Sequence, residues 1–448
     1  MIRHSVGYSF LIACVAVAPL VGCRPQPVSK SPTPSQPTEK TRSRAAPAAT
    51  TKPAADDPAA VAALQAAGVL LTKDKAGAVV EISVASDKDI SEPLSHMAGL
   101  PSTKIVRLAG PGVTDQGTRT LAQLAKLERL DLTDSAITDK TLAVVGKLKN
   151  LVALALRRTG VTDDGLAALE NFPKLRAIDL RNSNITDNGL THVAKIKSLV
   201  DVQLEKSKVT DAGVAKLKNL PLKSLNLNYC SSVSDKSLEI IGQMTSLESI
   251  QLDSTKISDA GMAAVANLRH LKRLRIRDTD ITGAGFAHLA KLASLERLEL
   301  RTTSLDDAGL GVIAGLPRVT YLDLSECRLV TAAGMKQIGK LTGLTYLGLW
   351  ETKANDDTMS ALGGLTNLEE LNLKATAITD AAVDTILKYK KLTKLNVGGT
   401  QLSDESFRKL GSLPSLKSLN VANTSIGYDV IDELNEKRKD LEVVEYEN

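Results

Sequence analysis

Aromatic residues, histidine and cysteine are all scarce in this chain of 448 residues. Aromatic side chains make up 3% of the sequence, and there are five histidines and four cysteines. The sequence contains no Cys-x-x-Cys motif, no Gly-rich phosphate loop, no Gly-x-Ser-x-Gly elbow and no His-Glu-x-x-His motif. We therefore expect a protein that is not an enzyme and that has neither a cofactor nor a metal site.

A large excess of charge of one sign is also lacking. The 56 basic residues nearly balance the 51 acidic residues. Residues 24–58 hold six basic and three acidic residues, so that without this segment and Arg3 there remain 49 basic and 48 acidic residues. Because non-specific binding of nucleic acid depends on a basic surface, this balance argues against nucleic acid as a partner.

The first 22 residues have the layout of an export signal, with a basic start and an apolar stretch that ends near Leu20. The tetrad Leu20-Val21-Gly22-Cys23 resembles the lipobox of bacterial lipoproteins. This resemblance implies export, cleavage before Cys23, and a lipid on the Cys23 thiol that anchors the protein at a bacterial membrane, on its periplasmic or surface side. An ordinary secretory signal and an uncleaved membrane anchor are the alternatives, and Pro19 disfavours the anchor.

Residues 23–58 change in composition to Pro, Ser, Thr and Ala, and almost no large apolar residue is present. Such a segment cannot bury a core, and its prolines favour extended chain. We interpret it as a disordered stalk that holds a folded domain away from the membrane. The next segment, residues 59–78, is apolar and rich in alanine, and we expect it to form a helix that caps the folded domain.

Short apolar segments recur every 23 to 25 residues through the rest of the chain. Each opens on an apolar residue and has further apolar residues at its fourth and sixth positions, as in Leu127, Leu130 and Leu132. This alternation predicts a short strand with one buried face. Residues 79–440 then hold about fifteen repeats, and residues 441–448 form a last capping strand. The clearest openers are Leu127, Leu151, Leu175, Leu199, Leu222, Leu247, Leu271, Leu295, Val319, Leu344, Leu368, Leu392, Leu416 and Leu441.

The second half of most repeats reads Ile-Thr-Asp-x-Gly-Leu or a close variant, followed by apolar residues at helical spacing. We expect the aspartate to be the N-cap of a short helix. These residues resemble the leucine-rich-repeat family. The resemblance implies an α/β right-handed solenoid, shaped like a horseshoe, with a parallel sheet on its concave face and short helices on its convex face.

The ninth position of each repeat indicates which type of leucine-rich repeat the sequence resembles. It holds a small polar residue throughout, which is similar to the cysteine-containing type of leucine-rich repeat, where this side chain bonds to the backbone of the turn. We predict a structural role for the whole column. Its members are Ser135, Thr159, Ser183, Ser207, Cys230, Thr255, Thr279, Thr303, Cys327, Thr352, Thr376, Thr400 and Thr424.

Positions three and seven of each strand are expected to face the concave side, where members of the family contact partners. Within these two columns, arginines and aromatic residues gather in neighbouring repeats, and such residues are common interface anchors. Gly348 at position five leaves a gap that we interpret as a notch. Stacked arginines repel one another unless they are paired, and we expect Glu299 and Asp278 to lie near enough to offset this repulsion. The candidate partner-binding residues are Arg273, Arg277, Arg297, Arg301, Tyr321, Tyr346 and Trp350, which we call the aromatic–arginine band.

The alternative is that these are ordinary solvated positions. A smaller basic group at Arg157, Arg158, Arg176 and Arg181 is a second candidate. The sequence thus predicts a monomeric scaffold for protein recognition, tethered to a membrane through Cys23. A structural spacer without a specific ligand and a glycan-binding protein remain alternatives.

Overall fold

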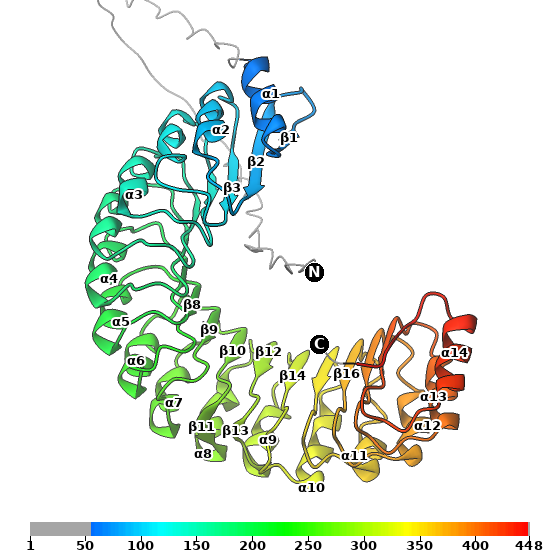
Figure 1. Cartoon of the computed structure of the whole chain (residues 1–448). Helices are drawn as coiled ribbons and strands as arrows, with labels where there is room; N and C mark the ends of the chain where they lie inside the picture. Colours follow the sequence, from blue (N-terminus) through cyan, green and yellow to red (C-terminus); the bar gives the residue numbers. More distant parts are fainter. Residues whose placement is uncertain (1–54, 447–448) are drawn as a thin grey trace, which may run out of the picture. The chain divides into compact units, whose positions relative to one another are not determined.

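The structure is a computed structural model that describes residues 55–446. The predicted export signal, Cys23 and nearly all of the predicted stalk lie outside these residues. The described residues form a long sheet of seventeen strands. Its strands line the concave side of the repeat array, and the helices lie on the convex side (Figure 1). The predicted arrangement of sheet and helices is therefore confirmed.

The strands of the sheet follow one another in chain order and are parallel, apart from β1 (Leu70–Lys73). Residues that pair across neighbouring strands are 23 to 25 positions apart in the sequence, as in Arg129 with Ala153 or Tyr321 with Tyr346. The parallel strands are β2 (Val79–Ala85), β3 (Ile105–Ala109), β4 (Arg129–Asp131), β5 (Ala153–Ala155), β6 (Ala177–Asp179), β7 (Asp201–Gln203), β8 (Ser224–Asn226), β9 (Ser249–Gln251), β10 (Arg273–Arg275), β12 (Arg297–Glu299), β14 (Tyr321–Asp323), β15 (Tyr346–Gly348), β16 (Glu370–Asn372), β17 (Lys394–Asn396), β18 (Ser418–Asn420) and β19 (Glu442–Val444).

Each repeat returns through a short helix or a 3-10 turn. Two short strands, β11 (Thr279–Thr282) and β13 (Thr303–Ser304), pair separately beside these returns. The α-helices are α1 (Pro58–Ala66), α2 (Ser91–Ser95), α3 (Asp139–Val145), α4 (Asp187–Val193), α5 (Asp211–Leu217), α6 (Asp235–Ile241), α7 (Asp259–Val265), α8 (Gly283–Phe286), α9 (Asp307–Ile313), α10 (Ala332–Met335), α11 (Asp356–Ala361), α12 (Val383–Ile386), α13 (Asp404–Gly411) and α14 (Tyr428–Lys437). The 3-10 turns are His96–Gly99, Arg119–Gln123, Asp164–Leu169, Ala287–Lys291, Lys336–Lys340 and Asp380–Ala382. None of the helices within residues 55–446 has the length and apolar character needed to cross a bilayer.

The core runs along the array between the sheet and the helices. The openers and the apolar residues at positions four and six are almost completely buried, as are Leu127, Leu130 and Leu132 in the repeat of β4. Helix residues such as Leu142 and Val145 complete the same layer. Because one repeat has too little apolar surface to form a core alone, each depends on its neighbours.

The column at position nine bonds to the backbone of the turn, as the sequence predicts. The hydroxyl groups of Ser135 and Thr255 each donate to the position-six carbonyl of their own repeat at 2.6 Å. The Cys230 and Cys327 thiols instead donate to carbonyls of the preceding repeat, at 3.3 and 3.2 Å. Burial raises the pKa of the Cys327 thiol to about 11, so that this thiol stays protonated at neutral pH.

The repeated aspartate does not cap its own helix, and this expectation was wrong. In most helices the preceding threonine or serine is the N-cap, as Thr138 is for α3. The aspartate instead reaches into the next repeat, where Asp139 accepts from the backbone N–H and the hydroxyl group of Thr162, at 2.8 and 2.6 Å. We call this contact the aspartate staple. Asp380 accepts in the same way from Ser403 N–H and the Ser406 hydroxyl group. The other staple aspartates are Asp115, Asp139, Asp163, Asp187, Asp211, Asp235, Asp259, Asp307 and Asp356.

The staple explains the small residue that lies two positions after the aspartate. A Cβ atom at Gly165 would lie 2.1 Å from Asp139 Oδ1, so the aspartate of one repeat occupies the space beside the glycine of the next. Where this glycine is replaced by serine, as at Ser237, the hydroxyl group donates to the staple aspartate Asp211 at 2.6 Å. The repeated sequence Thr-Asp-x-Gly is therefore a pattern of contacts between repeats.

The N-terminal cap differs from the single helix expected over residues 59–78. The helix α1 ends at Ala66, and Gly68 follows with φ +78°. The chain then forms β1, which pairs antiparallel with β2. An Asp74 carboxylate that accepts from Ala76 N–H forms the turn between the two strands. A local turn signal at residues 74–77 therefore overrides the apolar, alanine-rich composition.

At the other end, α14 and β19 close the array. The Arg438 guanidinium donates to the carbonyls of Gly411, Leu413 and Leu416, at 2.9, 3.0 and 2.9 Å. Arg438 thus covers carbonyl groups at the end of the preceding helical segment. A cationic side chain at a helix C-terminus also interacts favourably with the helix dipole.

The staple predicts a pH dependence of stability. Burial would raise the pKa of Asp211, but hydrogen bonds from Ser234 and Ser237 outweigh it and hold this pKa below its ordinary value. Such a group stabilises the fold above its unfolded pKa, near 3.9, and loses this effect as the pH falls through the folded pKa. We expect Asp211→Asn to lower the free energy of unfolding by about 1–3 kcal/mol at pH 7. The difference from the wild type should shrink below about pH 4.

Urea unfolding at several pH values measures this difference. The matched control is Asp432→Asn, because Asp432 lies exposed on α14. An effect of Asp211→Asn that equals the control, or that grows at acidic pH, would contradict the stabilising role of the staple.

Candidate functional site

The aromatic–arginine band occupies neighbouring strands in register. Arg273, Arg297, Tyr321 and Tyr346 are successive pairing partners on β10, β12, β14 and β15. The structure therefore brings the position-three members of the band together as one row on the sheet. Its position-seven members, Arg277, Arg301 and Trp350, lie just beyond the ends of three of these strands.

The two tyrosines form a stack that continues onto an arginine. The Tyr321 and Tyr346 rings are parallel within 4°, and their centroids are 3.9 Å apart. The Arg297 guanidinium carbon lies 3.4 Å from the Tyr321 ring centroid. Because a cation over an aromatic face is attracted electrostatically, the three side chains hold one another in place.

Trp350 forms a second stack. The Arg301 guanidinium carbon lies 4.2 Å from the Trp350 ring centroid, and Lys374 Nζ lies 5.0 Å from it. The Trp350 Nε1 atom is buried and has no hydrogen-bond partner within the described residues. An unsatisfied buried N–H group costs about 1–3 kcal/mol.

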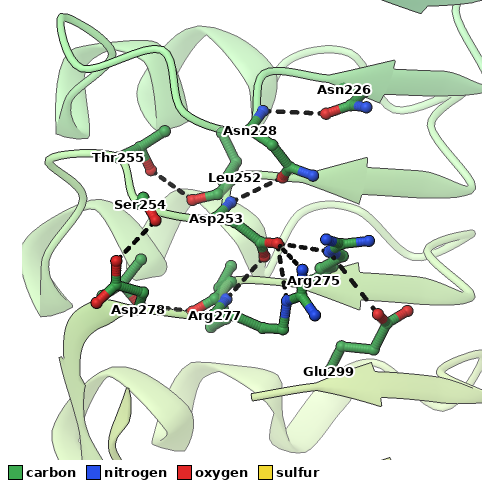
Figure 2. A network of polar contacts seen from close by, with 12 residues as sticks. Asn226, Asn228, Leu252, Asp253, Ser254, Thr255, Arg275, Arg277, Asp278 and Glu299 are labelled. Carbon is green, nitrogen blue, oxygen red and sulfur yellow. Dashed lines mark hydrogen bonds and ion pairs between the residues drawn. The ribbon is translucent and has the colours of Figure 1, made fainter. Parts of the chain in front are cut away.

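Two buried carboxylates beneath the band hold its arginines. Asp253 is 1% exposed and pairs with Arg275 and Arg277, at 2.6 and 2.8 Å. Glu299 is 5% exposed and pairs with Arg273 and Arg297, at 2.6 and 2.7 Å. Figure 2 shows the Asp253 carboxylate in contact with both Arg275 and Arg277, which lie on the same side of it, with Glu299 on the far side of Arg275.

The position-five column explains why this network lies where it does. In several repeats an Asp or Asn at position five accepts the N–H of position seven, as Asn226 does from Asn228 at 3.0 Å. Position five is a glutamine on β9 and Arg275 on β10. There the acceptor comes from the preceding repeat, so that Asn228 accepts from Asp253 N–H at 2.8 Å and Asp253 from Arg277 N–H at 2.9 Å (Figure 2).

The buried Asp253 carboxylate thus accepts both from the Arg277 backbone N–H and from its guanidinium group, and holds this residue in place. Burial raises the pKa of Asp253, and the charge of Arg277 offsets this effect only in part. The expectation that Glu299 lies near the stacked arginines is confirmed, but the sequence analysis did not identify Asp253 or Arg275 as part of the site. They could have been found by comparing position seven of each repeat with positions five and seven of the next repeat, where a carboxylate then faces two arginines.

Two local expectations were wrong. The gap at Gly348 is already filled, because a Cβ atom there would lie 2.6 Å from Asp323 Oδ1 and 3.1 Å from the Tyr346 hydroxyl oxygen. Asp278 was expected to help neutralise the stacked arginines, but its carboxylate accepts from Ser254 instead. Glu326, which was not expected, pairs with Arg301.

The second basic group is compensated in part by two carboxylates. Arg158 pairs with Asp134 through its guanidinium, and Arg181 pairs with the buried Asp179 at 2.7 Å. Arg157 lies 3.7 Å from the same Asp134 carboxylate. These two carboxylates offset about half of the charge of the four arginines, which weakens the group as a general anion-binding surface.

Groups for redox, nucleophilic or metal chemistry do not converge in this part of the molecule. Cys230 and Cys327 are buried free thiols, and burial raises the pKa of both. Within residues 55–446, no group of three or more His, Cys, Asp or Glu side chains could hold a metal ion. The geometry of the band is that of a rigid surface of rings and guanidinium groups.

Comparison with known proteins agrees with this fold. Residues 173–194 and 243–266 match the family model described as Leucine Rich repeat. The comparison with curated proteins gave no match.

Among solved structures, the chain is similar to a leucine-rich-repeat protein from Leptospira interrogans, with 19% identity and a TM-score of 0.51, over 78% of this chain and 91% of that one. It is also similar to an internalin from Listeria monocytogenes, with 21% identity and a TM-score of 0.49, over 81% and 94% of the two chains. The fold is a leucine-rich-repeat solenoid.

The buried carboxylates predict unequal effects of two similar substitutions. Glu299→Gln leaves Arg273 and Arg297 without their shared buried counter-charge, and we expect a loss of about 3–5 kcal/mol in the free energy of unfolding. Glu351→Gln removes a pair between the 40% exposed Glu351 and the 74% exposed Arg328. For such an exposed pair we expect a loss below about 1 kcal/mol.

Urea unfolding of both variants at one pH and salt concentration makes this comparison. Equal losses for the two variants would contradict the view that Glu299 organises the band.

Proposed function

We propose that this protein is a non-enzymatic recognition scaffold that binds a protein partner on the concave face at the aromatic–arginine band. The observation that carries this proposal is the pair of ordered stacks, Arg297–Tyr321–Tyr346 and Arg301–Trp350–Lys374. Interface energy is concentrated in tryptophan, tyrosine and arginine anchors. In a chain with 3% aromatic residues, three such rings lie in neighbouring repeats of one sheet face.

The rigidity of the band favours binding. Each rotamer-rich side chain that becomes ordered at an interface costs about 0.5–1.5 kcal/mol. Arg273, Arg277 and Arg297 are already held by Asp253 and Glu299, and the tyrosines are held by their stack. These side chains are therefore already ordered in the folded protein, and little further conformational entropy would be lost when a partner binds.

We further propose that the scaffold is an exported bacterial lipoprotein with repeats of the cysteine-containing type. The lipobox-like tetrad that ends at Cys23 and the composition of residues 23–58 support a lipid anchor and a stalk. The thiols of Cys230 and Cys327, which donate to backbone carbonyls of the preceding repeat, support the repeat type. The partner would then be a protein of the cell envelope or its surroundings, and the scaffold itself would be monomeric.

A structural spacer is the second candidate. Every arginine of the band is paired with a carboxylate, which favours this candidate, because most of these pairs join neighbouring repeats. A spacer would organise the envelope through its length and would need no specific ligand.

Substitution of Trp350 separates the two functions. We expect Trp350→Ala to weaken capture of the partner by about thirtyfold, because an interface anchor contributes 2 kcal/mol or more. Full-length protein, immobilised and incubated with envelope extract, would be compared with the variant by quantitative mass spectrometry. Tyr229→Ala is the matched control, since Tyr229 is 44% exposed and lies outside the band.

If Trp350→Ala captured the same proteins in the same amounts as the wild type, the band would be excluded as the interface. No protein enriched by the wild type would favour the spacer. Trp350 is a cleaner target than Arg277, because Arg277→Glu would place a second carboxylate against the buried Asp253.

The lipid anchor predicts a specific labelling result. In a bacterial host fed a fatty-acid analogue, the wild type and Cys14→Ala should carry the label and Cys23→Ala should not. The reason is that only the cysteine at the cleavage site is lipidated in the proposed processing. Label on Cys23→Ala, or no label on the wild type, would refute the anchor without affecting the proposed interface.

A further inference from the structure

A polar hollow of about 280 Å³ lies on the sheet beyond the aromatic–arginine band. Tyr346 borders it on one side, and Asn372, Asn396 and Asn420 line it, one from each of the strands β16, β17 and β18. The three asparagines are pairing partners across these strands, so that they form a straight row. Neighbouring strands are about 4.8 Å apart, which sets the spacing of the row.

Each asparagine is held by the same contact. Its Oδ1 atom accepts the backbone N–H two residues further on, at 3.0 Å for Asn372, 2.9 Å for Asn396 and 3.0 Å for Asn420. Since the oxygen already accepts a hydrogen bond, the NH₂ group is the part of each amide that can donate to a ligand. None of these three NH₂ groups has a partner among residues 55–446, whereas Asn226 Nδ2 on β8 donates to Gln203 at 2.9 Å.

The turn does not require an amide at this position. Asp131 and Asp323 occupy position five on β4 and β14, and their carboxylates accept from the equivalent N–H groups, at 2.9 and 3.1 Å. An asparagine adds two N–H donors and removes a negative charge. At position seven, Gly398 and Ala422 have little or no side chain and leave Asn396 and Asn420 uncovered, and the Lys374 ammonium beside Asn372 lies over the Trp350 ring.

The other groups around the hollow define the chemistry of its ligand. Lys394 and Glu370 form an ion pair at 2.8 Å, so that this pair adds no net charge. One face of the Tyr346 ring is occupied by Tyr321, and β16 with the hollow follows on the opposite side. The ligand should therefore be neutral, rich in hydrogen-bond acceptors, and able to place an apolar face against an aromatic ring.

The spacing of the donors selects among such ligands. In an extended peptide, carbonyl groups on one side recur at about 6.7 Å, so that they fall out of step with a row spaced at about 4.8 Å. In a β-1,4-linked sugar chain the rings follow one another at close to the strand spacing, and each ring offers hydroxyl oxygens as acceptors. We infer that this hollow binds a neutral linear glycan laid across β16, β17 and β18, with Asn372, Asn396 and Asn420 each donating to a sugar oxygen.

This site shares Tyr346 with the proposed protein interface but has its own donors, so that the two proposals can be tested separately. Trp350 does not line the hollow, so Trp350→Ala should leave sugar binding unchanged. Conversely, Asn396→Asp should leave capture of a protein partner unchanged.

Titration calorimetry of the full chain tests the inference, with β-1,4-linked tetramers of glucose, mannose and N-acetylglucosamine as ligands. We expect at least one tetramer to bind. Asn396→Asp should weaken that binding by about tenfold or more, because a carboxylate keeps the turn but cannot donate to the sugar. Asn226→Asp is the matched control at the same position of a repeat outside the hollow, and it should bind as the wild type does.

Circular dichroism and the urea unfolding midpoint establish that each variant is folded. Binding by none of the tetramers, or equal binding by the wild type and Asn396→Asp, would overturn the inference. Equal weakening by Asn396→Asp and Asn226→Asp would also overturn it, because the effect would then come from the fold and not from the hollow.

Discussion

The structure depends on the burial of each repeat's leucines against its neighbours. No repeat has a core of its own, so the repeats must stack in a fixed register, and the sheet aligns every position of one strand with the same position of the next. The pairing of Arg273, Arg297, Tyr321 and Tyr346 follows directly from this constraint. Side chains that lie far apart in the sequence thus form a continuous surface. A binding site on the concave face is therefore made of residues at equivalent positions of successive repeats.

The same register creates an electrostatic problem, because like residues in one column lie about one strand spacing apart. Arginines at positions three, five and seven of β10, and at positions three and seven of β12, would repel one another if no carboxylate lay beside them. Asp253 and Glu299 reduce this repulsion, and each serves arginines from two columns or two strands. The row of asparagines on β16, β17 and β18 has no such repulsion, because amides carry no charge.

The sequence predicts the features that repeat, and it predicts less well those that depend on one side chain's direction. The openers, the strands and the membership of each column follow from the period, and the structure confirms them. The role of the repeated aspartate was wrong because a motif read along the chain cannot show that Asp139 bonds to Thr162 in the next repeat. Gly348 was misread as a notch for a similar reason, since the Tyr346 side chain folds across its own strand. Glu299 was correctly expected beside the arginines, whereas Asp253 was missed because its partners lie on the diagonal between columns.

Aspartate staples join most neighbouring repeats, but the pattern breaks at two interfaces beneath the band. Gly283 stands where the staple aspartate is expected between β10 and β12, and Ala332 stands there between β14 and β15. The next N-caps are Asp306 and Asn355, which bond to their own helices.

These two interfaces carry other cross-repeat contacts on the concave side. Glu299 on β12 binds Arg273 on β10, and Tyr346 on β15 stacks on Tyr321 of β14. The contacts that fix the band in place thus also join the repeats where the staple is missing. A partner bound to these side chains would therefore contact the same groups that hold the repeats together, and its binding would stabilise the middle of the array by mass action.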